Sequence, residues 1–247
     1  MSRRSDLYRR LPVVDADRWW LEQAVAAPVP RVLELGAGTG RLTRAFAAHG
    51  CEVVAVERDP DMLAALRQTA GEAARIVAAD VAELPRVGAS GDELGRDHGL
   101  VALPTSLLNE LTDAEARRRL LRSAAERCHP QGRVAMQLLG PWWLASLPPR
   151  SVGRLLPADG SRAIDVTIEA ADLEPWEGRR RARLTYRFPD GAALTDDLEA
   201  DIVTPTELTA LLAEVGLELI GRFGAVPPAP PAAHDPAWHL VARPVTD

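Results

Sequence analysis

The chain has 247 residues, 47% of them hydrophobic and 26% charged, which suits one α/β domain with a full core. Its formal net charge of -6 argues against a nucleic-acid partner, because phosphate contacts need a concentrated positive face. No apolar run approaches the roughly 20 residues that cross a bilayer, and none follows the basic start MSRRSDLYRR. We therefore expect a cytoplasmic protein with no signal peptide and no membrane partner.

Apolar runs alternate with helix-like segments up to about Gly140. Because the runs are apolar on both faces, they predict buried parallel strands. These runs are Val32–Leu35, Val53–Val56, Ile76–Ala79, Leu100–Leu103 and Val134–Leu139.

The helical segments between the runs have recognisable starts. One covers Arg41–Ala48, and Asp59 can cap another that begins with Pro60. Thr112 with Glu115 forms the pattern of a capping box before a third. The alternation predicts a doubly wound, mostly parallel, Rossmann-like sheet.

The pattern changes after Gly140. The stretch AIDVTIEA alternates strictly, and RARLTYRF leads into the turn sequence PDG and a third strand. These strands predict a small antiparallel insertion with one wet face. Thr204 and Glu207 then cap another helix, and LELIGRFGAV and HLVARPV add two strands, which brings the main sheet to seven.

The stretch RVLELGAGTGRLT places a glycine loop between a strand and a helix, a common place for a nucleotide-like ligand. A Walker loop needs Gly-Lys-Ser/Thr, but Arg41 follows Gly40 and the chain has no lysine. A dinucleotide loop needs G-x-G-x-x-G, whereas the spacing from Gly36 is G-x-G-x-G. The dinucleotide interpretation is weakened and stays open.

Three carboxylates narrow the ligand further. Glu34 would repel a pyrophosphate before the loop and would suit a cationic amine. Glu57, at the end of the second strand, is placed to accept hydrogen bonds from ribose hydroxyls. Asp80 can accept from an adenine amine while the Val81 amide donates to the ring. These positions describe a nucleoside with a zwitterionic substituent and no phosphate.

The stretches VLELGAGTGRLT, VVAVERDPDML and AADVAEL resemble the first three motifs of the class I S-adenosylmethionine-dependent methyltransferases in order, spacing and strand ends. The later stretches LPTSLLNEL, GRVAMQLLGP, TPTELTALLAEVGLELI and HLVARPV are similar to the branch that includes glycine and sarcosine N-methyltransferases and many small-molecule methyltransferases. The resemblance begins at about Tyr8 and implies S-adenosyl-L-methionine as cofactor. It implies one domain, with an N-terminal lid helix (1–28), a cofactor-binding core (29–141), an antiparallel substrate cap (142–203) and a last helix with two strands (204–247).

The resemblance also implies which residues contact the methionine and ribose parts of the cofactor. Glu34 and the backbone around Gly36, Ala37 and Gly38 are expected to face the methionine moiety, and Glu57 to bind the ribose hydroxyls.

The other implied contacts concern the adenine and the sulfonium. Arg58 and Met62 are expected to lie along the adenine, with Asp80 and Val81 at its edge. The Leu103 carbonyl is expected near the ligand's amine or sulfonium.

One departure from the family pattern is at the fourth strand. Relatives usually begin it with an acid, as in FDLV, whereas this chain has DHGLV with Gly99 at that place. Either Asp97 substitutes through a shifted loop or the acid is absent.

Asn109 and Glu110 are the candidate catalytic residues, because they follow the fourth strand at the sheet edge where ligands bind. Many relatives have histidine at the position of Glu110, in a pattern like NHL. A glutamate there can take a proton or pair with a cationic substrate. The alternative is an ordinary carboxylate on a helix surface.

Paired tryptophans are the candidate substrate residues. Trp142 and Trp143 follow the fifth strand, and Trp19 and Trp20 lie on the N-terminal lid helix. We expect Trp20 and the Trp142–Trp143 pair to wall an acceptor pocket, with Tyr186 on the insertion as a weaker candidate. The alternative is core packing for both pairs.

No residue pattern predicts a metal site, since the two cysteines and the histidines share no ligand spacing. The arginines of GRRRARLTYR predict a solvated sheet face. The favoured partner is a small-molecule methyl acceptor with a nitrogen or oxygen nucleophile, as in secondary metabolism, and a homodimer stays open. The alternatives are an NAD(P)-dependent oxidoreductase and a cofactor-binding protein that transfers no methyl group, such as a cyclase, a decarboxylase or a regulatory module.

Overall fold

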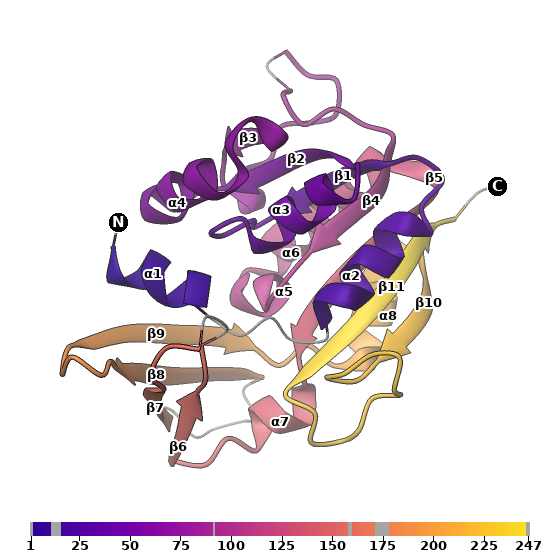
Figure 1. Ribbon diagram of the computed structural model, residues 1–247. Coiled ribbons are helices and arrows are strands. Elements are labelled where there is room, and N and C mark those ends of the chain that lie inside the picture. The colour runs from indigo at the N-terminus through magenta and orange to yellow at the C-terminus, as the bar shows by residue number, and fades with distance from the viewer. Residues whose placement is uncertain (1, 11–15, 91, 158–159, 171–177, 246–247) are drawn as a thin grey trace.

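The computed structural model describes residues 2–10, 16–90, 92–157, 160–170 and 178–245. Within them the chain forms a seven-stranded sheet of order β10-β11-β5-β4-β1-β2-β3 and a four-stranded sheet of order β6-β7-β8-β9 (Figure 1). The strands of the first sheet are β1 (Arg31–Leu35), β2 (Glu52–Glu57), β3 (Arg75–Ala78), β4 (His98–Leu103), β5 (Cys128–Leu139), β10 (Leu217–Phe223) and β11 (Ala237–Pro244). Those of the second are β6 (Arg150–Leu155), β7 (Ile164–Ala170), β8 (Arg179–Arg187) and β9 (Ala193–Asp201).

Strands β1 to β5 run parallel, while β11 is antiparallel to β5 and β10 is antiparallel to β11. The predicted α/β architecture, a mostly parallel seven-stranded sheet with an antiparallel insertion, is confirmed. The insertion has one strand more than its sequence suggests, because β6 pairs with β7 without alternating apolar residues of its own.

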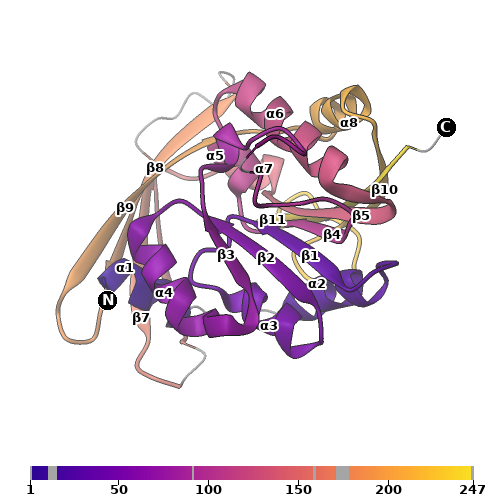
Figure 2. The ribbon, with the colours of Figure 1, turned by 90° about the horizontal axis from the view of Figure 1, so that it is seen from above.

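Helices cover both faces of the seven-stranded sheet, as Figure 2 shows from above. Helices α2, α3 and α4 pack on one face, and α6 and α8 pack on the other. The remaining helices lie at the sheet edge or on the insertion. The bounds are α1 (Arg3–Arg10), α2 (Ala16–Val25), α3 (Arg41–Ala48), α4 (Pro60–Ala70), α5 (Leu107–Glu110), α6 (Ala114–Arg127), α7 (Pro141–Ala145) and α8 (Pro205–Glu214). No helix in these described ranges is long and apolar enough to cross a membrane.

The starts of the helices are fixed by capping side chains, and one of the predicted caps differs from the observed one. Asp59 caps α4 by accepting from the backbone N–H groups of Asp61 and Met62, and Thr204 caps α8 in a capping box. Helix α6 is capped by Asp113, whose carboxylate accepts from Glu115 N–H, and the predicted cap at Thr112 is wrong.

A backbone contact explains the missing acid at the start of β4. A Cβ added at Gly99 would lie 2.1 Å from the Val29 carbonyl oxygen and 3.0 Å from the Ala27 Cβ. No side chain therefore fits at this position. Asp97, with a φ of 60°, lies outside the strand, where it pairs with Arg96.

We predict that Gly99→Ala lowers the free energy of unfolding by about 1–3 kcal/mol or more, because the new methyl group must displace strand backbone. Gly153→Ala in β6 is the matched control, since a Cβ there meets nothing within 4 Å. Chemical denaturation measures both variants. Equal stability of the two would contradict the close approach of Gly99 to Val29.

Candidate functional site

A cavity of about 240 Å³ opens at the carboxyl ends of β1, β2, β3 and β4, next to α1. This edge is the usual ligand crevice of an open α/β sheet. Its wall combines backbone from the glycine loop, carboxylates from the strand ends and side chains from α1, α4 and α5. The wall residues are Arg4, Tyr8, Gly36, Gly38, Glu57, Arg58, Asp59, Met62, Ala79, Asp80, Val81, Pro104, Thr105, Leu107, Glu110 and Leu111.

The glycine loop turns sharply because Gly36 and Gly38 have φ values of +80° and +57°. The backbone N–H groups of Gly36 and Ala37 both donate to the Val56 carbonyl, which fixes the loop to β2. A Cβ at Gly38 would meet no protein atom within 4 Å. This face of the loop is open to a ligand.

The Glu57 carboxylate is held by backbone N–H groups from two loops. Oε2 accepts from Gly38 N–H at 2.8 Å, and Oε1 accepts from Arg58 and Asp59 N–H at 2.8 Å each. Three donors orient a nearly buried carboxylate between the glycine loop and the start of α4. The oriented carboxylate is part of the cavity wall.

Asp80 and Arg58 close the β3 end of the cavity. Asp80 accepts from Ala82 N–H at 2.9 Å and from the Arg58 guanidinium at 2.8 Å. Burial pushes the pKa of Asp80 upward, but these hydrogen bonds and the arginine charge outweigh it, so the pKa is lowered. The wall between these polar groups is apolar, formed by Met62 and Val81.

Three of the expected cofactor residues lie behind the wall. Glu34 is 1% exposed and accepts a 2.6 Å hydrogen bond from the Thr43 hydroxyl of α3. Burial, with a smaller effect from Glu57, raises the pKa of Glu34 to about 8 in spite of that hydrogen bond. Ala37 and Leu103 are buried in the core.

Helix α1 supplies two wall residues that we did not predict. Arg4 pairs with Asp59 at the start of α4 and with Asp196 of β9, each at 3.4 Å. Tyr8, one turn later, has a raised pKa because it is buried and lies near the charges of Asp196 and Glu110. The only sequence signal was this i, i+4 spacing within a basic segment.

Glu110 lies in the wall, while its neighbour Asn109 does not. Glu110 is exposed at the end of α5, and its Oε1 accepts a hydrogen bond from the Ser106 hydroxyl. Thr105, also in the wall, has a φ of 61°, which is rare for a β-branched residue.

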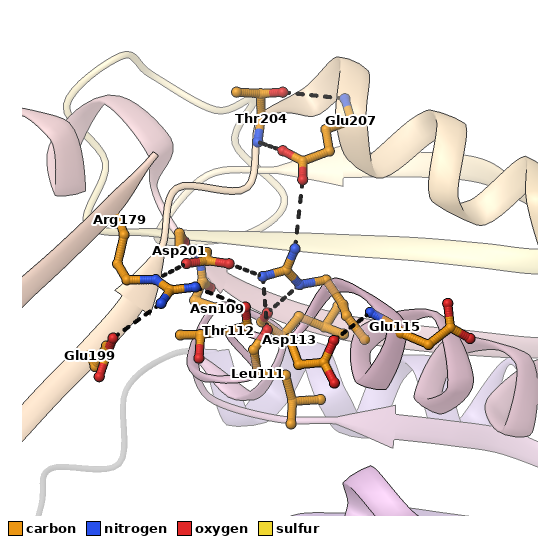
Figure 3. Close-up of polar contacts among 12 residues, drawn as sticks. Asn109, Leu111, Thr112, Asp113, Glu115, Arg179, Glu199, Asp201, Thr204 and Glu207 are labelled. Carbon is orange, nitrogen blue, oxygen red and sulfur yellow. Dashed lines mark hydrogen bonds and ion pairs between the residues drawn. The ribbon is translucent and has the colours of Figure 1, made fainter. Parts of the chain in front are cut away.

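Asn109 is fully buried between the two sheets (Figure 3). Its side-chain amide donates to the Asp201 carbonyl, and its Oδ1 accepts from Leu139 N–H, both at 2.9 Å. The Asp201 carboxylate accepts from the Arg117 and Arg179 guanidinium groups at 2.7 Å each. The expectation of a catalytic Asn109 is corrected: the residue joins β5 to β9.

The tryptophans lie outside the cavity wall. Trp20 is 1% exposed and packs with Trp19 in the core under α2, so the core-packing alternative holds there. Trp142 is half exposed against Trp238, and Trp143 packs beside Leu144 at the base of the insertion. The predicted wall role of the pairs is thus corrected.

Tyr186 also stays outside the wall. It packs with Leu7, Ile164 and Phe188 under α1. Its pKa is raised by burial and by the nearby Tyr8 and Asp196. No group of three or more His, Cys, Asp or Glu side chains that could hold a metal occurs in the described ranges.

Residues 32–132 match the family model described as "Methyltransferase domain". The matched segment runs from β1 into β5 and includes the glycine loop, Glu57, Asp80 and Glu110. Together with the sheet order, this match identifies the segment. Residues 32–132 form a domain of the class I S-adenosylmethionine-dependent methyltransferase type, whose methyl donor is S-adenosylmethionine.

Solved structures share the fold over nearly the whole chain. The CcbJ methyltransferase from Streptomyces caelestis is 23% identical with a TM-score of 0.79, covering 95% of this chain and 91% of that one. CalS10, an amino pentose methyltransferase from Micromonospora echinaspora, is 20% identical with a TM-score of 0.69, covering 93% and 90%.

A curated relative is similar only over a short segment. The ribosomal RNA small subunit methyltransferase A of Anaeromyxobacter dehalogenans is 53% identical over 53 residues, which are 22% of this chain and 19% of the relative. The chain thus spans about a fifth of that relative's length.

Glu34 predicts a pH-dependent stability. Because its pKa is raised from 4.5 to about 8 on folding, the stabilisation by its bound proton is complete below the unfolded value and is lost as pH rises through about 8. We predict that the free energy of unfolding of Glu34→Gln, relative to that of the native chain, increases by at least ~1 kcal/mol when the pH is raised from about 5 to about 9. Denaturant unfolding at both pH values measures this.

Glu52→Gln, at an exposed position on β2, is the control and should show no such gain. A pH-independent difference between Glu34→Gln and the native chain would show that Glu34 does not bind its proton near pH 8.

Proposed function

We propose that this protein transfers the methyl group of S-adenosylmethionine to an amine nitrogen of a small molecule. The supporting observation is Glu110, a carboxylate in the cavity wall held by the neutral Ser106 hydroxyl. In the described part of the chain Glu110 forms no ion pair, whereas Arg4 and Arg58 in the same wall both pair with aspartates. An amine acceptor is the ligand that matches this uncompensated negative charge.

The wall fits S-adenosylmethionine. The open face of Gly38 leaves room for the ligand beside the loop, and the oriented Glu57 carboxylate suits ribose hydroxyls. Asp80 and the apolar Met62 and Val81 suit the adenine edge and face. The cofactor supplies a methyl group that its sulfonium makes electrophilic.

The chain's own contribution is to orient the acceptor and to hold its proton. An ammonium pairs with Glu110, and the nitrogen needs its lone pair free for the reaction, so the Glu110 carboxylate is the group that accepts the proton. Ser106 holds one oxygen of Glu110 in place. Tyr8 and α1 cover the same side of the cavity and keep water out, and positioning of this kind supplies several kcal/mol of barrier lowering.

CalS10 is described as an amino pentose methyltransferase, which supports an acceptor that carries an amine. A hydroxyl acceptor is the second candidate, since Glu110 can also act as its base.

The cofactor is tested by isothermal titration with S-adenosylhomocysteine and, separately, with NAD. We expect S-adenosylhomocysteine to bind and NAD not to bind. Glu57→Ala should weaken S-adenosylhomocysteine about 10-fold or more, because hydrogen bonds to a charged group contribute about 1.5–3 kcal/mol. Glu52→Ala, on the same strand, should bind as the native chain does. Tighter binding of NAD would instead support the oxidoreductase alternative.

The acceptor class is tested with isotope-labelled S-adenosylmethionine and matched panels of small amines, amino sugars and alcohols, with mass spectrometry of the products. We expect labelled N-methyl products. If only alcohols carried the label, the accepting atom would be oxygen instead of nitrogen. If the cofactor bound but neither panel became labelled, a non-methylating role would be favoured.

With the best acceptor from those panels, we predict that Glu110→Gln lowers turnover about 100-fold or more while S-adenosylhomocysteine affinity stays unchanged. Glu72→Gln, at an exposed position after α4, is the charge-matched control. Unchanged turnover in Glu110→Gln would remove Glu110 from the mechanism.

A further inference from the structure

The four-stranded sheet has one covered face and one open face. Helix α1 lies over the covered face (Figure 1), where its Leu7 packs with Ile164 and Phe188. Six ionic side chains of the open face are more than half exposed: Arg150, Arg154, Asp165, Glu169, Arg183 and Asp197. The open face therefore has no partner within the described chain.

Three rows of side chains cross all four strands of the open face, since residues paired directly across antiparallel strands share a face. From β6 to β9, the first row alternates in charge: Arg150, Glu169, Arg183, Asp197. The middle row is uncharged: Val152, Thr167, Thr185, Thr195. The third row alternates again until its last member: Arg154, Asp165, Arg187, Ala193.

This order of charges makes the face complementary to itself. A twofold axis parallel to the strands keeps each row at its own level and reverses the order of the strands, so that β6 faces β9 and β7 faces β8. Arg150 then lies opposite the partner's Asp197, and Glu169 lies opposite the partner's Arg183. In the third row, Asp165 lies opposite the partner's Arg187.

The other in-plane twofold axis, perpendicular to the strands, gives the opposite result. It places each strand over its own copy and exchanges the two charged rows. Arg150 would then face the partner's Arg154, and Glu169 would face the partner's Asp165. Like charges would meet at both positions, so the charge pattern selects one orientation of two copies.

We propose that the open face of the β6–β9 sheet binds the same face of a second copy of this chain, with β7 over β8. Arg187 supports this choice, because it is exposed and forms no ion pair within the described residues. In the proposed dimer each Arg187 gains the partner's Asp165. The middle rows of threonine and Val152 meet at the centre.

The dimer is expected to be weak and salt-sensitive. Four strands spaced about 4.8 Å apart form a patch smaller than the roughly 800 Å² per partner of a standard interface. Its contacts are ionic and solvent-accessible, and salt screens such contacts. The cavity lies beyond α1, on the covered side of the sheet, so cofactor binding stays independent of association.

Sedimentation velocity over a range of protein concentrations tests the proposal, at about 0.01 M and about 1 M NaCl, where the Debye length falls from ~30 Å to ~3 Å. We expect a monomer–dimer equilibrium that shifts to monomer at high salt. Asp165→Arg and Arg187→Asp should each abolish the dimer, because each places two pairs of like charges at the interface.

An equimolar mixture of Asp165→Arg and Arg187→Asp chains should restore a dimer, because every pair across the heterodimer is then opposite in charge. Arg44→Asp, at an exposed position of α3, is the control and should dimerise like the native chain. Titration with S-adenosylhomocysteine and circular dichroism confirm that each variant is folded.

A native chain that stays monomeric at low salt would overturn the proposal. A dimer that survives both charge reversals, or a mixture that stays monomeric, would overturn it as well. Since S-adenosylhomocysteine binding is measured on the same samples, failure of the dimer is distinguishable from failure of the proposed methyl transfer.

Discussion

The site depends on the hydrogen bonds that join the two sheets, here called the joint, which Asn109, Arg117 and Asp201 form. Asn109 binds β5 through Leu139 and β9 through Asp201, and Arg117 binds the same aspartate from α6. Both side chains are buried, so each donor and acceptor that they leave unpaired would carry a desolvation penalty. These contacts fix the position of the four-stranded sheet relative to the carboxyl ends of the strands of the seven-stranded sheet. Helix α1 packs on that sheet, so the same joint places α1 at the cavity.

The fold was predictable where sequence and structure are linked locally. The buried strands β1 to β5 show continuous apolar runs, and the caps at Asp59 and Thr204 need only neighbouring residues. Strand β6 was missed, because its residues are mostly exposed and only pairing with β7 keeps it extended. The cap at Asp113 was missed because Thr112 and Glu115 fit the pattern of a capping box one residue earlier.

The candidate site was predictable where the position of a residue along its own strand decides whether it lines the cavity. Residues at strand ends, such as Glu57 and Asp80, lie in the wall because parallel strands end at one edge, and Glu110 follows from the short helix after β4. Arg4 and Tyr8 arrive there through the packing of α1 on the insertion, which no local pattern encodes. The tryptophan pairs were predicted to line the pocket, but their residue type alone does not distinguish a pocket from a core. A large aromatic ring serves a core as readily as a pocket, and Trp20 lies in the core.

All 29 basic residues are arginine, and Arg117 shows what this means for the joint. A guanidinium stays protonated in proteins and presents several donors in one plane, which here reach two carbonyls and a carboxylate. One planar group thus links α5, the residue that follows it and β9 to α6, an arrangement that a lysine ammonium, as a point charge, would not match.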